Sequence, residues 1–130
     1  MLDKFVGSIK GYFYQEFPID IYIKELPETI KVPSMFFPQP NILHLPFSKQ
    51  SYQVNYTMNV QLFEKDTPTA MQKAESIAHS IRKNKSSIPL LNNDGTRDER
   101  NIVFSTVSCE SVEEGIVQIR LEWEQEFNYK

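Results

Sequence analysis

Few residues in this sequence are suited to chemistry: two histidines, His44 and His79, and one cysteine, Cys109. A catalytic triad or a two-histidine metal site needs partners at a recognisable spacing, and neither histidine has such a partner. We expect His79 to be a helix-surface or interface residue, and His44 to pack against neighbouring side chains. Cys109 is followed by Glu110, whose charge disfavours the thiolate that a reactive cysteine needs. The sequence therefore predicts no catalytic residue, no metal site and no cofactor.

Two further features superficially suggest chemistry. The segment 94–99 is rich in oxygen ligands, but it lacks the alternating acidic ligands and the distal glutamate of an EF-hand, so we expect a solvated turn. A small enzyme with a pocket between sheet and helices is the alternative from another functional class. It would use Tyr52, Tyr56 or Glu25, although no pair of these titratable groups has a recognisable spacing.

Three glutamates alternate near the end of the chain, at Glu122, Glu124 and Glu126. Side chains two residues apart in a strand project from the same face. The simple interpretation is a solvated strand face. The alternative is a surface along which DNA must move without being held, because carboxylates repel phosphates.

Two segments, at about 38–51 and 86–100, combine turn-forming residues with large apolar side chains. We expect both to be irregular arms. Soluble monomers rarely leave such apolar patches exposed, so the arms either fold back on the core or dock on a neighbouring subunit. We favour docking. The candidate subunit-interface residues are Ile42, Leu43, Leu45, Phe47, Ile88, Leu90 and Leu91.

The composition is that of an ordinary globular chain. It has 130 residues, 40% of them hydrophobic and 24% charged, and a net charge of -3. This length predicts a single domain spanning 1–130. A negative net charge argues against a dedicated nucleic-acid binder or a basic membrane-surface protein. A single cysteine excludes an internal disulfide and fits a reducing cytoplasm, and segment 1–10 resembles neither a signal peptide nor a membrane span.

Apolar periodicity predicts two helices. Apolar residues recur at three- and four-residue spacing from Leu2 to Phe13, and Pro18 should end this helix. A second apolar stripe spans 71–81. Thr67 is the expected cap of the second helix, with Pro68 in its first position.

Alternating side chains predict the strands. Short strands are expected at 19–24 and 32–37, a long strand at 52–63, and a final hairpin from 101–109 and 116–129. The predicted class is α+β: a mainly antiparallel sheet of about four to five strands packed against two helices.

The segment 17–25, FPIDIYIKE, followed by 33–37, PSMFF, resembles tail terminator proteins of phages and phage-like elements of Gram-positive bacteria. Those proteins have an N-terminal helix, a strand like P-x-x-I-Y-x-x-E and a strand like P-S-F-F. A long strand, a helix and a closing hairpin then follow, which is the order expected here. Met35 stands where an aromatic residue is common, and the segment 86–100 is rather long.

This resemblance implies a tail-terminator-like fold that forms a hexameric ring on the head-proximal end of a tail tube, without catalysis. The implied partners are further copies of the chain, the tail tube protein, a neck or head-completion protein and, in a contractile tail, the sheath. DNA would only pass through the lumen, which Glu122, Glu124 and Glu126 would face, and no membrane is involved. The protein would lie in the host cytoplasm during assembly and then in the tail or neck of the virion. The alternative in the same particle is a neck or head–tail connector subunit that contacts portal-side proteins.

Overall fold

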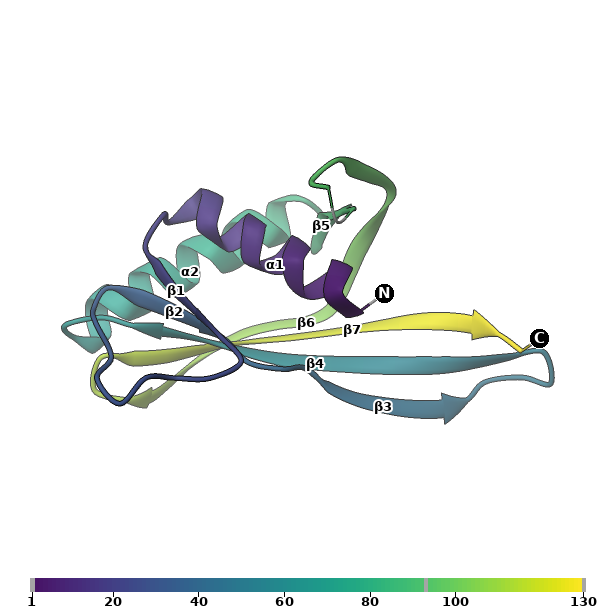
Figure 1. The fold of residues 1–130 in the computed structure, drawn as a ribbon, viewed down its shortest axis with the longest axis horizontal. Helices are drawn as coiled ribbons and strands as arrows, with labels where there is room; N and C mark the ends of the chain where they lie inside the picture. Colours follow the sequence, from purple (N-terminus) through teal and green to yellow (C-terminus); the bar gives the residue numbers. More distant parts are fainter. Residues whose placement is uncertain (1, 93, 130) are drawn as a thin grey trace.

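A computed structural model describes residues 2–92 and 94–129 and places two helices on one side of a long, curled sheet (Figure 1). In chain order the elements are α1 (Leu2–Glu16), β1 (Asp20–Ile23), β2 (Ser34–Phe37), β3 (Asn41–Pro46), β4 (Ser51–Phe63), α2 (Thr67–Lys83), β5 (Ser87–Leu91), β6 (Arg97–Glu113) and β7 (Ile116–Asn128). The side chain of Leu2, predicted to begin the first apolar stripe, lies outside the described residues, as does Asn93 in the second predicted arm.

The sheet has seven strands in the order β1-β2-β4-β7-β6-β5, and β3 pairs with β4 as a branch from this path. Only β1 and β2 run parallel; the other pairings are antiparallel. The predicted α+β class with a mainly antiparallel sheet is confirmed. Seven strands exceed the expected number because the two predicted arms contain strands of their own.

The prediction that 38–51 and 86–100 are irregular is therefore wrong, since β3 and β5 lie within them. Prolines in these segments hid the strands. Pro46 ends β3, which pairs with β4 alone among the described strands, so its missing N–H leaves the sheet intact. Pro89 lies beside a shift in the β5–β6 register, another place where a strand tolerates proline.

Helix α1 packs on the sheet through Phe5, Ile9 and Phe13, all buried, and it ends at Glu16 before Pro18 as predicted. Its polar contact with β5 is specific. The buried Ser8 hydroxyl lies 2.7 Å from the carbonyl oxygen of Lys4 and accepts a 2.7 Å hydrogen bond from the backbone N–H of Leu91. The helix thus satisfies a backbone donor at the end of β5.

Helix α2 is capped by Asp66, whose carboxylate accepts a 2.8 Å hydrogen bond from the backbone N–H of Thr69. The prediction of Thr67 as the cap is wrong by one residue. A carboxylate suits this position better because it also complements the positive end of the helix dipole. Thr67 serves the β6–β7 turn instead: its hydroxyl accepts a 3.0 Å hydrogen bond from the N–H of Gly115 and donates one to Glu114.

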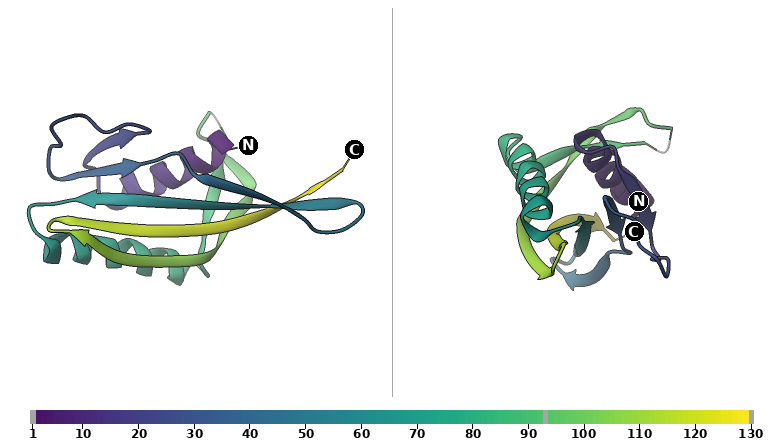
Figure 2. Two further views of the ribbon diagram at one scale, coloured as in Figure 1. Left: turned by 90° about the horizontal axis from the view of Figure 1, so that it is seen from below. Right: turned by 90° about the vertical axis from the view of Figure 1, so that its left-hand side faces the viewer.

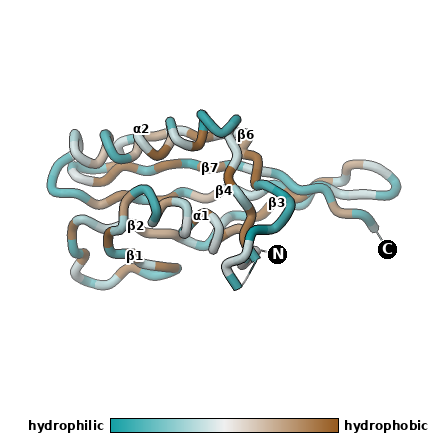
Figure 3. The backbone as a smooth tube through the Cα atoms, turned by 90° about the horizontal axis from the view of Figure 1, so that it is seen from above, coloured by the Kyte–Doolittle hydropathy of each residue, from teal (hydrophilic) through white to brown (hydrophobic). Residues whose placement is uncertain are grey.

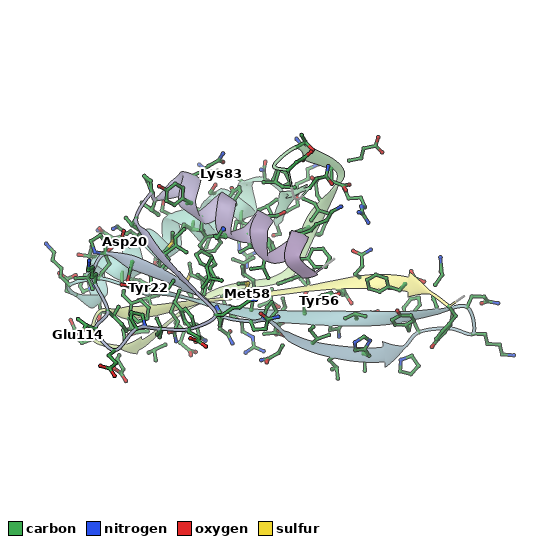
Figure 4. The ribbon with its side chains drawn as sticks, viewed as in Figure 1. Asp20, Tyr22, Tyr56, Met58, Lys83 and Glu114 are labelled. Atoms are coloured by element: carbon green, nitrogen blue, oxygen red, sulfur yellow. The ribbon has the colours of Figure 1, made fainter. Side chains whose placement is uncertain are left out.

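Gly115 is required at this turn for two reasons. Its φ of 80° is a conformation that side chains disfavour, and a Cβ there would collide with the carbonyl oxygen of Glu64. The glycine carbonyl in turn accepts a 2.8 Å hydrogen bond from the N–H of Glu64. The end of β4, the start of α2 and the final hairpin are fixed together at this point, at the left end of the sheet, where Figure 4 labels Glu114.

The buried side chains form one cluster between the helices and the sheet, and Trp123 belongs to it. The Trp123 ring stacks on Tyr56 at 5.2 Å and meets Phe5 and Phe104 edge-on at 5.7 and 5.9 Å. Trp123 is 2% exposed, which confirms the predicted facing of the last strand.

We expect Trp123→Ala to lower the free energy of unfolding by about 3–5 kcal/mol, because the truncation leaves a large cavity beside three aromatic rings. Urea denaturation measures the loss. The adjacent exposed Glu124→Ala is the control and should change stability by less than about 0.5 kcal/mol. Equal losses in the two variants would contradict the assigned faces of β7.

Candidate assembly surfaces

The two predicted interface segments differ in burial: one is part of the core and the other is exposed. In β5, Ile88 and Leu90 are 1% and 2% exposed and belong to the protein's own core, while Leu91 is partly buried. Docking of Ile88 and Leu90 on another subunit is therefore excluded in this fold, and that prediction is wrong. Ile88 and Leu90 alternate with Ser87 and Pro89, which is the pattern of a half-buried strand, but the proline argued against a strand in the sequence.

In β3 and at Phe47, directly after it, the large apolar side chains remain uncovered. Ile42, Leu43, Leu45 and Phe47 are 45%, 57%, 38% and 61% exposed, and every residue from Asn41 to Gln50 is exposed. Because β3 pairs only with β4 among the described strands, one backbone edge of β3 is also free. These four residues remain candidate subunit-interface residues.

The strands that carry these residues extend past both helices (Figures 1 and 3). We call this part the projecting end: β3, residues 51–55 of β4 and residues 124–128 of β7. Its tip is closed by hydrogen bonds of Ser48 N–H to the Ser51 carbonyl, 3.0 Å, and of Tyr129 N–H to the Gln50 carbonyl, 2.7 Å. The projecting end is thus an ordered three-stranded sheet rather than a loose arm.

One face of the projecting end carries an aromatic cluster around Tyr52. Its ring lies 5.3 Å from Tyr129, 5.6 Å from Phe127 and 6.0 Å from His44. His44 is therefore packed against a neighbour, as expected. The sequence alone did not reveal this cluster, because three strands far apart in the chain contribute to it.

The opposite face of the sheet is polar and neither helix covers it (Figure 2). The in-register pairing of β4 with β7 places the three alternating glutamates there, as predicted. The face is formed by Gln53, Asn55, Thr57, Asn59 and Gln61 of β4 and by Gln118, Arg120, Glu122, Glu124 and Glu126 of β7.

The three glutamates differ in their electrostatics. Arg120 donates hydrogen bonds of 2.9 and 2.7 Å to Glu122 and, together with Thr106, holds the pKa of that carboxyl below its usual value. Glu124 accepts a hydrogen bond from the Gln53 amide, and Glu126 is exposed. The Glu122 charge is thus compensated within the chain, and the acidic character concentrates at Glu124 and Glu126 on the projecting end.

A groove of about 390 Å³ lies at the C-terminal end of α2. Three cations line it: Lys83, Lys85 and Arg97. The remaining lining residues are Asn84, Ser87, Ile88, Pro89 and Asn101, so no carboxylate contributes. We call it the basic groove; no local sequence pattern indicates it, because Arg97 is distant from the two lysines in the chain.

The residues that an enzyme would use do not converge. Tyr56 is stacked on Trp123, and burial, followed by Tyr52, raises the pKa of the Tyr56 phenol. Glu25 follows β1, which β2 separates from β4. Burial, followed by the charge of Glu75, also raises the pKa of the Cys109 thiol, opposite to the shift that activates a cysteine.

The segment 94–99 contains the expected turn. Asp94 accepts hydrogen bonds of 2.9 and 2.6 Å from the N–H and hydroxyl of Thr96, which lower the pKa of Asp94. Among residues 2–92 and 94–129, no group of three or more histidine, cysteine or acidic side chains is placed to hold a metal ion. No helix within these residues has the length and apolar character needed to cross a membrane.

Comparison with known proteins finds no matching family model. The chain is 31% identical to the uncharacterized protein YqbJ of Bacillus subtilis strain 168 over 125 residues, 96% of this chain and 86% of YqbJ. It is 28% identical over 123 residues to XkdJ of the phage-like element PBSX from the same organism, covering 95% of this chain and 84% of XkdJ. Among solved structures, a chain from the virion of a native gene transfer agent particle superposes with a TM-score of 0.46 at 12% identity, covering 95% of this chain and 96% of that one.

The different environments of β3 and β5 predict different responses to the same substitution. We expect Leu90→Ser to lower the free energy of unfolding by at least about 2 kcal/mol, because it removes a buried apolar side chain and buries a hydroxyl. The matched variant Leu43→Ser, on the exposed strand, should stay within about 0.5 kcal/mol of wild type. Urea denaturation would reveal an error in this placement if the two losses were similar.

Proposed function

Because this chain belongs to the family of the Bacillus subtilis protein YqbJ, we propose that it is a structural protein of a phage-like particle and, within it, the tail terminator. Similarity to XkdJ of the phage-like element PBSX extends over nearly the whole chain and supports the particle. The two segments that resemble tail terminators form β1 and β2, which pair side by side. The terminator would form a hexameric ring that caps the head-proximal end of the tail tube.

The observation that carries an assembly role is the projecting end. It holds exposed Leu43 and Leu45 on an ordered strand with a free backbone edge, and exposed Phe47 follows directly after that strand. Large apolar side chains at fixed positions are what the buried centre of a subunit interface requires. A rigid extension of this kind can reach a neighbour without ordering a flexible arm on contact, which would cost conformational entropy.

We also propose that the polar face over the body of the sheet lines the channel. There the amides and hydroxyls of β4 lie beside the Arg120–Glu122 pair, whose charges cancel. Such a wall offers a DNA backbone little net attraction, so the genome could move past it. Of the three glutamates, only Glu122 lies on this part of the face.

The proposed partners are further copies of the chain, the tail tube protein, a neck or head-completion protein and, where the tail contracts, the sheath. The protein would then be a component of the tail or neck of the virion. Its action would be mechanical: occupying the tube end stops growth and presents a surface for the head.

Mixing the purified protein with purified tail tubes tests the proposal directly. Electron microscopy should show one ring at a single end of each tube, and particles lacking the protein should have headless tubes of uncontrolled length. Binding to portal-side neck proteins without binding to tubes would instead identify a head–tail connector and contradict the terminator assignment.

We expect the double variant Leu43→Ser/Leu45→Ser to fold with an unchanged melting temperature but to lose tube capping. The apolar surface that it removes is exposed in the single chain and is proposed to be buried in the ring. Val112→Ser is the control, because Val112 is 47% exposed near the opposite end of the sheet. Normal capping by the double variant would exclude these leucines from the interface.

A further inference from the structure

We infer that the projecting end of one copy docks, with its acidic face, in the basic groove of the next copy. This inference rests on the proposed ring and deepens it, because it names the two surfaces that meet. The occupant of the groove is a second copy of this chain, and the charge and the order of side chains across each surface make the two surfaces complementary.

The acidic face is built from two rows of side chains that cross three strands in register. Each row begins with an exposed leucine of β3, continues through an amide of β4 and ends with a carboxylate of β7. The rows are Leu43–Asn55–Glu124 and Leu45–Gln53–Glu126. Gln53 donates to Asn55 at 2.7 Å and also to Glu124, so the amides hold one another and one carboxylate in place.

No ion pair among the described residues compensates the charge on this face. Glu124 and Glu126 are exposed, and none of the four ion pairs formed by the described side chains includes either of them. Arg120 is on the same face, but Glu122 occupies it. The projecting end therefore presents two carboxylates beside an apolar edge, and a partner surface must supply cations beside an apolar or neutral strip.

The basic groove has this composition. Lys83, Lys85 and Arg97 supply the cations, and Pro89 with Asn84 and Asn101 supplies the apolar and amide surface. Within the described part of the chain, Arg97 donates only to Asn101, at 3.3 Å, and none of the three cations forms an ion pair. Both surfaces thus carry unmatched charge, and the signs are opposite.

The two surfaces lie on different parts of the molecule. The basic groove comes from the end of α2, β5 and the start of β6, whereas the acidic face comes from β3, β4 and β7. Lys83 lies on the helical side of the sheet, away from the projecting end (Figure 4). Contact between two different surfaces of identical copies is heterologous, and its repetition closes into a ring when the rotation per copy permits.

A charge exchange between the two surfaces tests the contact. One variant carries Glu124→Lys and Glu126→Lys, and the other carries Lys83→Glu and Lys85→Glu. Each alone should self-associate at least about 100-fold more weakly than wild type, because like charges then face each other. An equimolar mixture should associate again in alternating order, and so should the quadruple variant, since every contact in them pairs opposite charges. Sedimentation velocity measures association, and electron microscopy measures capping of purified tail tubes.

The controls reverse the same number of exposed charges elsewhere: Glu25→Lys/Glu28→Lys and Lys24→Glu/Lys31→Glu, on the loop after β1. They should associate like wild type.

Wild-type association should weaken as salt is raised, because screening acts beyond about 8 Å at physiological ionic strength. If a charge-reversed variant does not fold, Glu124→Gln/Glu126→Gln and Lys83→Gln/Lys85→Gln take its place and should each weaken association without abolishing it.

Charge-reversed variants that associate and cap like wild type would overturn the inference while leaving the proposed terminator intact. If particles built with the Glu124→Lys/Glu126→Lys variant then eject DNA more slowly than wild type, these two glutamates lie in the lumen instead. Loss of association that neither the mixture nor the quadruple variant restores would also overturn the pairing of these two surfaces. A wild-type protein that neither self-associates nor caps tubes would contradict the proposed function and the inference together.

Discussion

The rest of the structure depends on the antiparallel ladder between β4 and β7. All 13 residues of β4 pair with β7 without a register shift, from Ser51 with Asn128 to Phe63 with Ile116. Because successive side chains alternate between faces, an unbroken register commits every second residue to the helical side and the others to the polar side. A slip of one residue would move Trp123 into water and the glutamates into the core, so the register is strongly specified.

This ladder is longer than the helices that cover it. Over the body of the molecule α1 and α2 bury its apolar face, and the hydrogen bonds among Glu64, Thr67 and Gly115 fix its closed end. Beyond the helices the same pairing continues, no helix covers the sheet, and β3 extends it by pairing with the edge of β4 (Figure 1). One continuous element thus serves stability at one end and, in the proposed ring, association at the other. Substitutions in the two halves should consequently affect different measurable properties.

The sequence predicted well those elements whose pattern is local. The alternation in β4 and β7 and the apolar stripes of both helices gave the fold class and the buried face of Trp123. Prediction failed where the deciding contact lies far away in the chain. The hydrogen bond from Leu91 to Ser8 holds β5 against α1, and no local pattern indicates it. Thr67 and Asp66 are both good caps, and only the position of the Gly115 turn assigns Thr67 elsewhere. The basic groove and the aromatic cluster likewise arise from residues that only the tertiary fold brings together.

The free edge of β3 exposes the single chain to unwanted strand pairing. An exposed strand edge with apolar side chains can recruit unrelated strands, which leads to aggregation in a crowded cell. Pro40 and Pro46 bracket this edge, and neither can donate a backbone hydrogen bond to an added strand. Any intruding strand is therefore limited to the short stretch between two prolines, too short to propagate a stack efficiently. In the proposed ring, the prolines that obscured the strand in the sequence would thus restrict wrong strand pairing before a neighbouring copy covers this edge.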